Sequence, residues 1–152
     1  IENCPRGLHV QTGGVFGGPV HIDGLYFEPR SMSAWQADQP NDHIFIEGEG
    51  PGTASVSNCL FQAGTRQVPI AFTAVRARGL ACLSVTSCVW QKAKFRPGQG
   101  ENFFIDADDS VAMVVDQLNY LVSTSLGDLH RIDPRVRHQA NNALDSSVRR
   151  AR

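Results

Sequence analysis

The sequence predicts an all-β protein, built as a parallel β-helix of about four to five coils with a helix at its C-terminal end. Three observations lead to this fold class. Helix signals are nearly absent before residue 110, short apolar runs alternate with polar residues as strands do, and one six-residue pattern recurs along the chain. The 152 residues and 41% hydrophobic content are enough for one domain with a core.

The strand candidates are short apolar runs bounded by Gly, Pro, Asn and Asp. They lie at residues 19–27, 43–47, 54–61, 68–75, 80–90 and 102–105. The chain holds 14 Gly and 8 Pro, and many of them cluster between these runs. Such punctuation is typical of strands joined by loops.

The recurring pattern reads aliphatic, polar, small or polar, Cys or Leu, any residue, aromatic. Copies start at Ile22, Val56, Val85 and Val115, and a degenerate copy starts at Ile1. In a parallel β-helix each strand lies on the preceding one about 4.8 Å away, and the loops vary in length without disturbing the stack. An antiparallel β-sandwich or jelly roll is the alternative, because it also has short strands and frequent turns.

The C-terminal end reads differently, so we divide the chain into a β-helix-like body, 1–125, and a basic helical arm, 126–152. Asp133-Pro134 is a helix-start signal. One apolar stripe follows at four-residue spacing, made by Val136, Ala140, Leu144 and Val148. We expect a helix over 134–150 that caps the open end of the stack.

The phrases at residues 1–10, 21–27 and 56–61 resemble coil sequences of the right-handed β-helix superfamily of pectate-lyase-like proteins. The resemblance covers about residues 1–120. It implies a right-handed stack and a kinship with polysaccharide lyases and hydrolases, phage tailspikes and adhesins. Of the polygalacturonase-type motifs only Asp-Asp is present, as Asp108-Asp109, so the resemblance does not carry an activity with it.

Three acidic residues, Asp106, Asp108 and Asp109, are the candidate catalytic groups. Glycosidases use two carboxylates about 5–9 Å apart, and alternate residues of one strand lie about 7 Å apart on one face. The same acids are also suited to Ca²⁺ binding or to a solvated turn with a helix cap.

A basic row, Lys92, Lys94 and Arg96, is the candidate substrate-binding group, together with Trp35 on the long loop 28–42. Three cations at alternate positions share one strand face, and neighbouring aromatic rings suit stacking on sugars. The row predicts binding of an acidic polysaccharide, or the base and charge clamp of a lyase, with a solvated strand face as the alternative.

The formal charge of −1 is unevenly distributed. Residues 131–152 hold six arginines and two aspartates, a charge of +4, which leaves −5 on the preceding residues. Five arginines of this arm are the candidate partner-binding residues, for a neighbouring subunit or a nucleic acid: Arg135, Arg137, Arg149, Arg150 and Arg152.

No metal site and no cofactor is predicted. The histidines, at positions 9, 21, 43, 130 and 138, have no His-x-x-x-His or His-Glu-x-x-His spacing. The four cysteines include no Cys-x-x-Cys, and their apolar neighbours predict buried free thiols and synthesis in a reducing compartment. No signal peptide or transmembrane segment is visible.

Three functions are consistent with these observations. The favoured one is a non-catalytic or weakly catalytic segment of a larger surface or viral protein, tailspike-like or adhesin-like, which recognises carbohydrate. The second is a viral structural or assembly protein whose basic arm binds a partner, and the third is a polysaccharide lyase or hydrolase. We expect a homo-oligomer or part of a larger assembly on a virion or cell surface, and the chain to be a processed or truncated piece.

Overall fold

The computed structural model describes residues 1, 6–13, 18–28, 41–62, 72–91, 103–122 and 129–145. Within these ranges the chain forms strands and turns and no helix, and so no helix there is long and apolar enough to span a bilayer. The strands are β1 (Arg6–Thr12), β2 (Val20–Asp23), β3 (Tyr26–Phe27), β4 (Asp42–Gly48), β5 (Thr53–Ser57), β6 (Leu60–Gln62), β7 (Thr73–Arg78), β8 (Cys82–Thr86), β9 (Val89–Gln91), β10 (Phe103–Ala107), β11 (Met113–Val122), β12 (His130–Ile132) and β13 (Arg137–Asp145).

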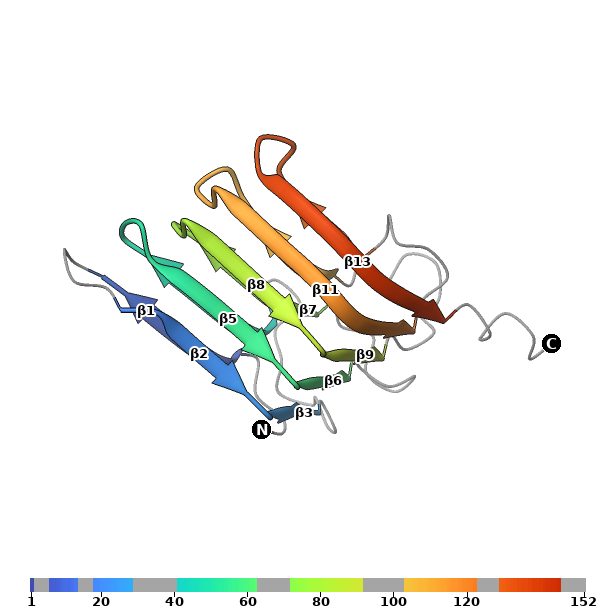
Figure 1. Cartoon of the computed structure of the whole chain (residues 1–152). Helices are drawn as coiled ribbons and strands as arrows, with labels where there is room; N and C mark the ends of the chain where they lie inside the picture. Colours follow the sequence, from blue (N-terminus) through green and yellow to red (C-terminus); the bar gives the residue numbers. More distant parts are fainter. Residues whose placement is uncertain are drawn as a thin grey trace.

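The strands form two sheets between which the chain alternates. The first sheet has the order β1-β4-β7-β10-β12. In the second, β2-β5-β8 and β3-β6-β9 form two rows that both join the long strand β11, and β13 pairs with the far side of β11 (Figure 1). Every pairing among the described strands is parallel, which excludes the antiparallel sandwich.

One circuit of the chain through both sheets, here called a coil, begins in the first sheet and ends in the second. The first three coils are β1–β3, β4–β6 and β7–β9, and the last two are β10–β11 and β12–β13. The recurring six-residue pattern lies where each coil bends within the second sheet. Its third residue has a positive φ in four coils: Gly24 (70°), Asn58 (53°), Ser87 (55°) and Leu118 (57°).

The register corrects the fourth copy of the pattern by one residue. Val85 pairs with Asp116 and Trp90 with Leu121, so the copy starts at Asp116 and not at Val115. The first position of the pattern is aliphatic in the other copies. In the sequence alone Val115 therefore fits that position, and the carboxylate of Asp116 does not. Leu118 then holds the bend, and it is 73% exposed.

The core consists of inward-facing side chains that stack from coil to coil. Phe27, Phe61, Trp90 and Leu121 form one such ladder, all fully buried. The rings of Phe27 and Phe61 stack with centroids 5.3 Å apart. Burial of one large apolar side chain contributes about 1.5–3 kcal/mol, so these ladders stabilise the stack. Cys59 and Cys88 are free and buried, as predicted, whereas Cys82 is half-buried.

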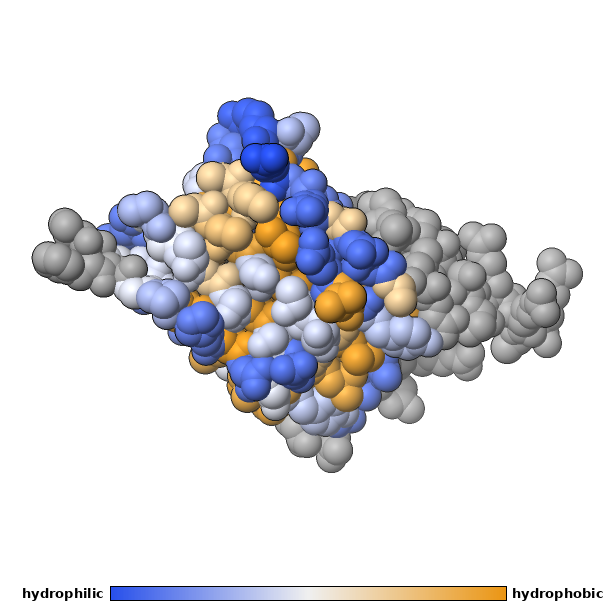
Figure 2. All heavy atoms as spheres, viewed as in Figure 1, coloured by the Kyte–Doolittle hydropathy of each residue, from blue (hydrophilic) through white to orange (hydrophobic). Residues whose placement is uncertain are grey.

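The outward face of the second sheet carries short polar side chains together with a few apolar ones. His21, Ser55 and Ser84 form one polar ladder there. Tyr26 and Tyr120 are 38% and 44% exposed. Figure 2 shows this face as a mosaic of hydrophilic and hydrophobic surface.

The predicted helix over 134–150 is wrong. β12 pairs with β10, and β13 pairs with β11, so residues 130–145 extend both sheets by one coil. Asp133 does cap, but it caps a turn: its carboxylate accepts a hydrogen bond from the backbone N–H of Arg135 at 2.9 Å. Residues four apart share one face in a strand as well as in a helix, so the apolar stripe does not distinguish the two. Residues 137–145 form a strand because they pair with the free edge of β11.

Candidate metal centre

Three inward ladders that are apolar in the earlier coils each hold one polar residue in the last two coils, and the ladder of Asp116 ends in Ala140. The residues that break them are Asp116 on β11, His130 on β12 and His138 on β13. The ladders run Ile22, Val56, Val85, Asp116; Leu8, Ile44, Val75, Ile105, His130; and Val20, Ala54, Leu83, Val114, His138. Stacking in register therefore brings together three polar side chains that the sequence keeps apart.

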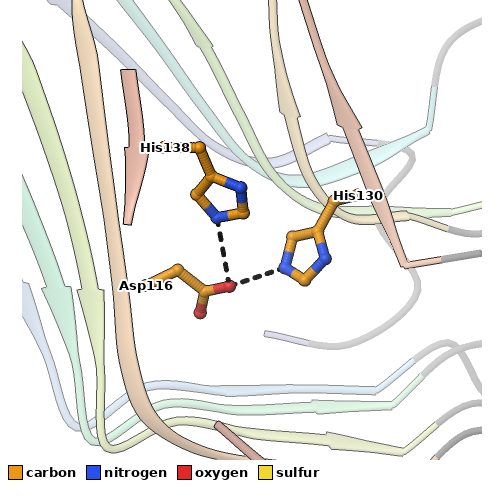
Figure 3. Close-up of side chains that lie close together, drawn as sticks. All are labelled: Asp116, His130 and His138. Carbon is orange, nitrogen blue, oxygen red and sulfur yellow. Dashed lines mark ion pairs between the residues drawn. The ribbon is translucent and has the colours of Figure 1, made fainter. Parts of the chain in front are cut away.

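These three side chains point toward one another inside the stack (Figure 3). Oδ2 of Asp116 lies 2.6 Å from Nε2 of His130 and 3.7 Å from Nε2 of His138. One ligand atom from each residue lies within 4.8 Å of the other two. The side chains are 0%, 12% and 27% exposed, respectively, so the cluster is open to solvent mainly at His138.

The carboxylate of Asp116 needs compensation because an unpaired charge in an apolar interior is strongly unfavourable. Oδ1 accepts a hydrogen bond from Nδ2 of Asn119 at 2.6 Å. Oδ2 is buried, and apart from the two imidazole contacts the described residues give it no hydrogen bond of regular geometry. One oxygen is thus held by the protein while the other faces the two imidazoles.

The environment favours the neutral form of His138. Burial lowers its pKa, the neighbouring His130 lowers it further, and Asp116 opposes both effects without reversing them. A neutral imidazole has a free lone pair on one ring nitrogen, which is the form that binds metal ions. The centroids of the two imidazole rings are 5.2 Å apart.

Two imidazoles and one carboxylate form a donor set suited to Zn²⁺ or to Fe²⁺. Structural zinc sites have four protein ligands, whereas three protein ligands leave a position for water or substrate. The residues present therefore fit a metal ion with an open coordination position. The buried and incompletely satisfied Oδ2 of Asp116 is the structural feature that points to a ligand.

Sequence motifs miss this cluster because its members are 14 and 8 residues apart. Short metal-binding motifs place ligands on one helix or one hairpin, but these ligands lie on three strands that meet by register. The signal in the sequence is a polar residue at a position that is aliphatic in the other coils. It becomes visible only when the fourth copy of the pattern is aligned on Asp116.

The predicted catalytic residues lie together on another part of the molecule. Asp106 is on β10, facing outward, and its carboxylate meets Arg76 at 2.9 Å, Arg78 at 3.4 Å and Arg131 at 2.6 Å. Burial raises the pKa of Asp106, but the hydrogen bond from Arg131 and the charges of the arginines outweigh it, so the pKa is lowered overall.

The other two predicted carboxylates are also paired with arginines. Asp108 lies 2.8 Å from Nε of Arg78, and Asp109 lies 2.8 Å from Arg135. Asp108 also accepts hydrogen bonds from the backbone and the hydroxyl of Ser110. Asp106 and Asp108 thus share one network of ion pairs through Arg78, whereas Asp109 pairs separately with Arg135. The catalytic role of the three acids stays a prediction.

The remaining predicted site residues are described only in part. Arg135 is 71% exposed and pairs with Asp133 as well as Asp109. Arg137 lies on β13, and its backbone N–H donates to the carbonyl of Ala112. The predicted sites that lie outside the described residues are Trp35, Lys92, Lys94, Arg96, Arg149, Arg150 and Arg152.

Comparisons with protein-family models, with curated proteins and with solved structures found no match to this chain.

Proposed function

We propose that the chain is a right-handed parallel β-helix that binds one divalent transition metal ion through Asp116, His130 and His138. The convergence of three interior ladders on metal-binding residue types carries this proposal. A purely structural interior would continue the aliphatic ladders, because burying a carboxylate costs free energy that a valine does not cost. Polar residues at three positions that are aliphatic in the earlier coils therefore favour a functional role over a purely structural one.

The β-helix supports the site by fixing the register of the strands that carry the ligands. The chain visits the two sheets in the same order in each coil, and every pairing among the described strands is parallel. The ladders of the three ligands keep their register, because the register shift between β11 and β13, at Gln117 to Tyr120, comes after Asp116. A crossover that joins adjacent parallel strands of one sheet is right-handed in about 98% of cases, which favours the right-handed form.

The ligands come from three strands of the last two coils, so a bound ion would join the last coil to the rest of the stack. An ion that binds only the folded state stabilises it, by about 2.7 kcal/mol at 100 times Kd. For a chain of this size that is a rise of roughly 5–10 °C in Tm.

Thermal unfolding of the full chain with EDTA, Zn²⁺ or Fe²⁺ (the last without oxygen) tests the proposal. We expect a rise in Tm with Zn²⁺ or Fe²⁺ and its loss in Asp116→Asn and in His138→Gln. His21→Gln is the matched control, because His21 lies on the outward face of β2 and contacts Ser55. An unchanged Tm in the wild type, or an equal rise in all four proteins, would overturn the proposal.

Carbohydrate recognition is a second proposal, based on Trp35 and on the row Lys92, Lys94 and Arg96. One observation supports it: Phe27 and Trp90 belong to one ladder, so β3 and β9, the strands that come before residues 29–40 and 92–102 in the chain, end at the same edge of the second sheet. Binding to acidic oligosaccharides that disappears in Trp35→Ala and in the Lys92/Lys94 double alanine variant would support recognition. Absence of binding to any acidic glycan would contradict it.

The wider biological setting stays a prediction. This applies to the tailspike-like or adhesin-like role, the virion or cell-surface location, the homo-oligomer or larger assembly and partner binding by the basic arm. Assembly that persists after deletion of 131–152 would contradict the role of the arm. Release of unsaturated or reducing sugar ends would favour the lyase or hydrolase alternative.

A further inference from the structure

Asn119 differs from the residues that occupy its position in the earlier coils. It is the fourth residue of the recurring pattern, where the first three coils have Leu25, Cys59 and Cys88. Asn119 is fully buried, and it lies one bend away from Asp116 on the same strand. A polar amide in this apolar ladder needs hydrogen-bond partners, and these partners define its orientation.

The backbone of the preceding coil leaves the amide one orientation. The N–H of Cys88 can only donate, and it lies 2.8 Å from Oδ1 of Asn119. The carbonyl of Val85 can only accept, and it lies 2.9 Å from Nδ2. Exchanging the amide oxygen and nitrogen would break both bonds, so the nitrogen keeps this side, and its two hydrogens are shared among the Val85 carbonyl, Oδ1 of Asp116 and Oδ1 of Asn142.

Asn142 holds the same amide from the last coil. Two residues of β11, Leu118 and Asn119, lie where β13 has one, because the register shifts between Gln117 and Tyr120. Oδ1 of Asn142 accepts from the backbone N–H of Asn119 at 3.1 Å and from its Nδ2 at 3.0 Å. The backbone N–H at this irregularity is therefore satisfied, and the amide is clamped between two coils.

We infer that Asn119 is a positioning residue that makes Asp116 a monodentate ligand, an inference that rests on the proposed metal site. The Asn119 amide holds Oδ1 at 2.6 Å, which leaves Oδ2, the oxygen nearest to both imidazoles, for the ion. A monodentate carboxylate with two imidazoles suits four-coordinate Zn²⁺, whereas a released carboxylate can bind through both oxygens and raise the coordination number. Partners of this kind affect metal affinity by about 10–100-fold.

Two variants of Asn119 test the inference in the full chain. Asn119→Leu removes the donor and places at this position the residue that the first coil has there, Leu25. Asn119→Asp keeps the shape and the acceptor for the Cys88 N–H but loses the N–H donors. Asn141→Asp, which adds the same charge on the outward side of β13, is the matched control for charge.

The readouts are zinc affinity by competition with a chelating dye and the visible absorption spectrum of the Co²⁺-loaded protein. We expect zinc affinity to fall about 10–100-fold in Asn119→Leu and Asn119→Asp, with wild-type affinity in the control. We also expect weaker Co²⁺ bands in both variants, because higher-coordinate Co²⁺ absorbs less than the four-coordinate ion. A merely structural role would lower the Tm of the metal-free protein but leave the affinity and the loaded spectrum unchanged, and that result would overturn the inference while the proposed function stands. If the wild type binds neither metal, the proposed function itself fails and the inference fails with it.

Discussion

Asp106 and Asp116 are both buried, at 3% and 0% exposed, but they are surrounded by different chemistry. Asp106 meets three guanidinium groups on the outward side of the first sheet. Asp116 meets two imidazoles and one amide in the interior. A guanidinium is always charged and has no lone pair to give, whereas a neutral imidazole has one. The first environment therefore suits permanent ion pairing, and the second suits ligand binding.

The largest effect is expected at the outward network. Asp106→Asn leaves Arg76, Arg78 and Arg131 without their shared carboxylate, and loss of one partner of a buried pair costs about 3–5 kcal/mol. Urea unfolding should show this loss, while the rise in Tm with Zn²⁺ persists. Asp23→Asn, at an exposed carboxylate, is the control and should cost much less. Loss of the zinc response in Asp106→Asn would show that the two regions are coupled.

A pH effect of similar size is expected from His43, which is buried with aromatic ring neighbours. Burial lowers its pKa to about 4, against the weaker opposing effect of its hydrogen bond to the carbonyl of Gln62. Between pH 6.5 and 4 the unfolded chain binds the proton more readily than the folded chain, so stability is retained above this window and falls as pH drops through it.

The loss from His43 should reach roughly 3 kcal/mol by pH 4. Chemical unfolding from pH 7 to 4 in the wild type and in His43→Phe measures it, because both proteins share the other titrating groups. The variant should be less stable at pH 7 but less dependent on pH. Parallel curves for the two proteins would contradict the assignment.

A substitution at Gly79, next to Arg78 of the outward network, should lower stability without affecting the cluster of Asp116, His130 and His138. Gly79 follows Arg78 with a φ of 62°, and a Cβ there would lie 1.9 Å from the carbonyl oxygen of Gly48. Gly79→Ala should therefore cost about 2 kcal/mol or more, and it should leave the zinc response intact because the ligands are in the last two coils. Gly18→Ala is the control, since its Cβ would meet nothing within 4 Å. Equal unfolding midpoints for the two variants would refute the prediction.

The smallest effect is expected at Arg135, which pairs with Asp109 and Asp133 but is 71% exposed. Solvent screens such pairs, so they contribute little to stability. Arg135→Ala should shift the urea midpoint only slightly, and 1 M NaCl should remove the difference. A larger loss that persists in high salt would place Arg135 in the buried network with Asp106.

The recurring pattern predicts the stacked parallel strands because each coil meets the same steric demands. An inward aliphatic residue, a bend and an inward ring recur in the coils that contain Val56 and Val85, and the ladders repeat them in space. The pattern could not predict the strand β13 of the last coil, because apolar residues four apart share one face in a strand and in a helix alike.

The proposed metal centre could not be predicted from spacing because register, and not distance along the chain, brings Asp116, His130 and His138 together. Asp116 pairs with Val85, and His138 pairs with Val114, but both pairings depend on where the bend falls. Once the copies are aligned on the bend at Leu118, the carboxylate stands out in an aliphatic column. Trp35, Lys92 and Lys94 lie outside the described residues, so their roles stay predictions.

Asp116, His130 and His138 all lie in the last two coils. The number of coils that precede them can therefore change without changing the cluster. Each described strand pairs only with strands of adjacent coils, so a coil inserted between β6 and β7 would lengthen the molecule without changing any distance within the cluster. The scaffold is in this sense modular, with the polar cluster at one end of the described stack and a body that further coils can extend.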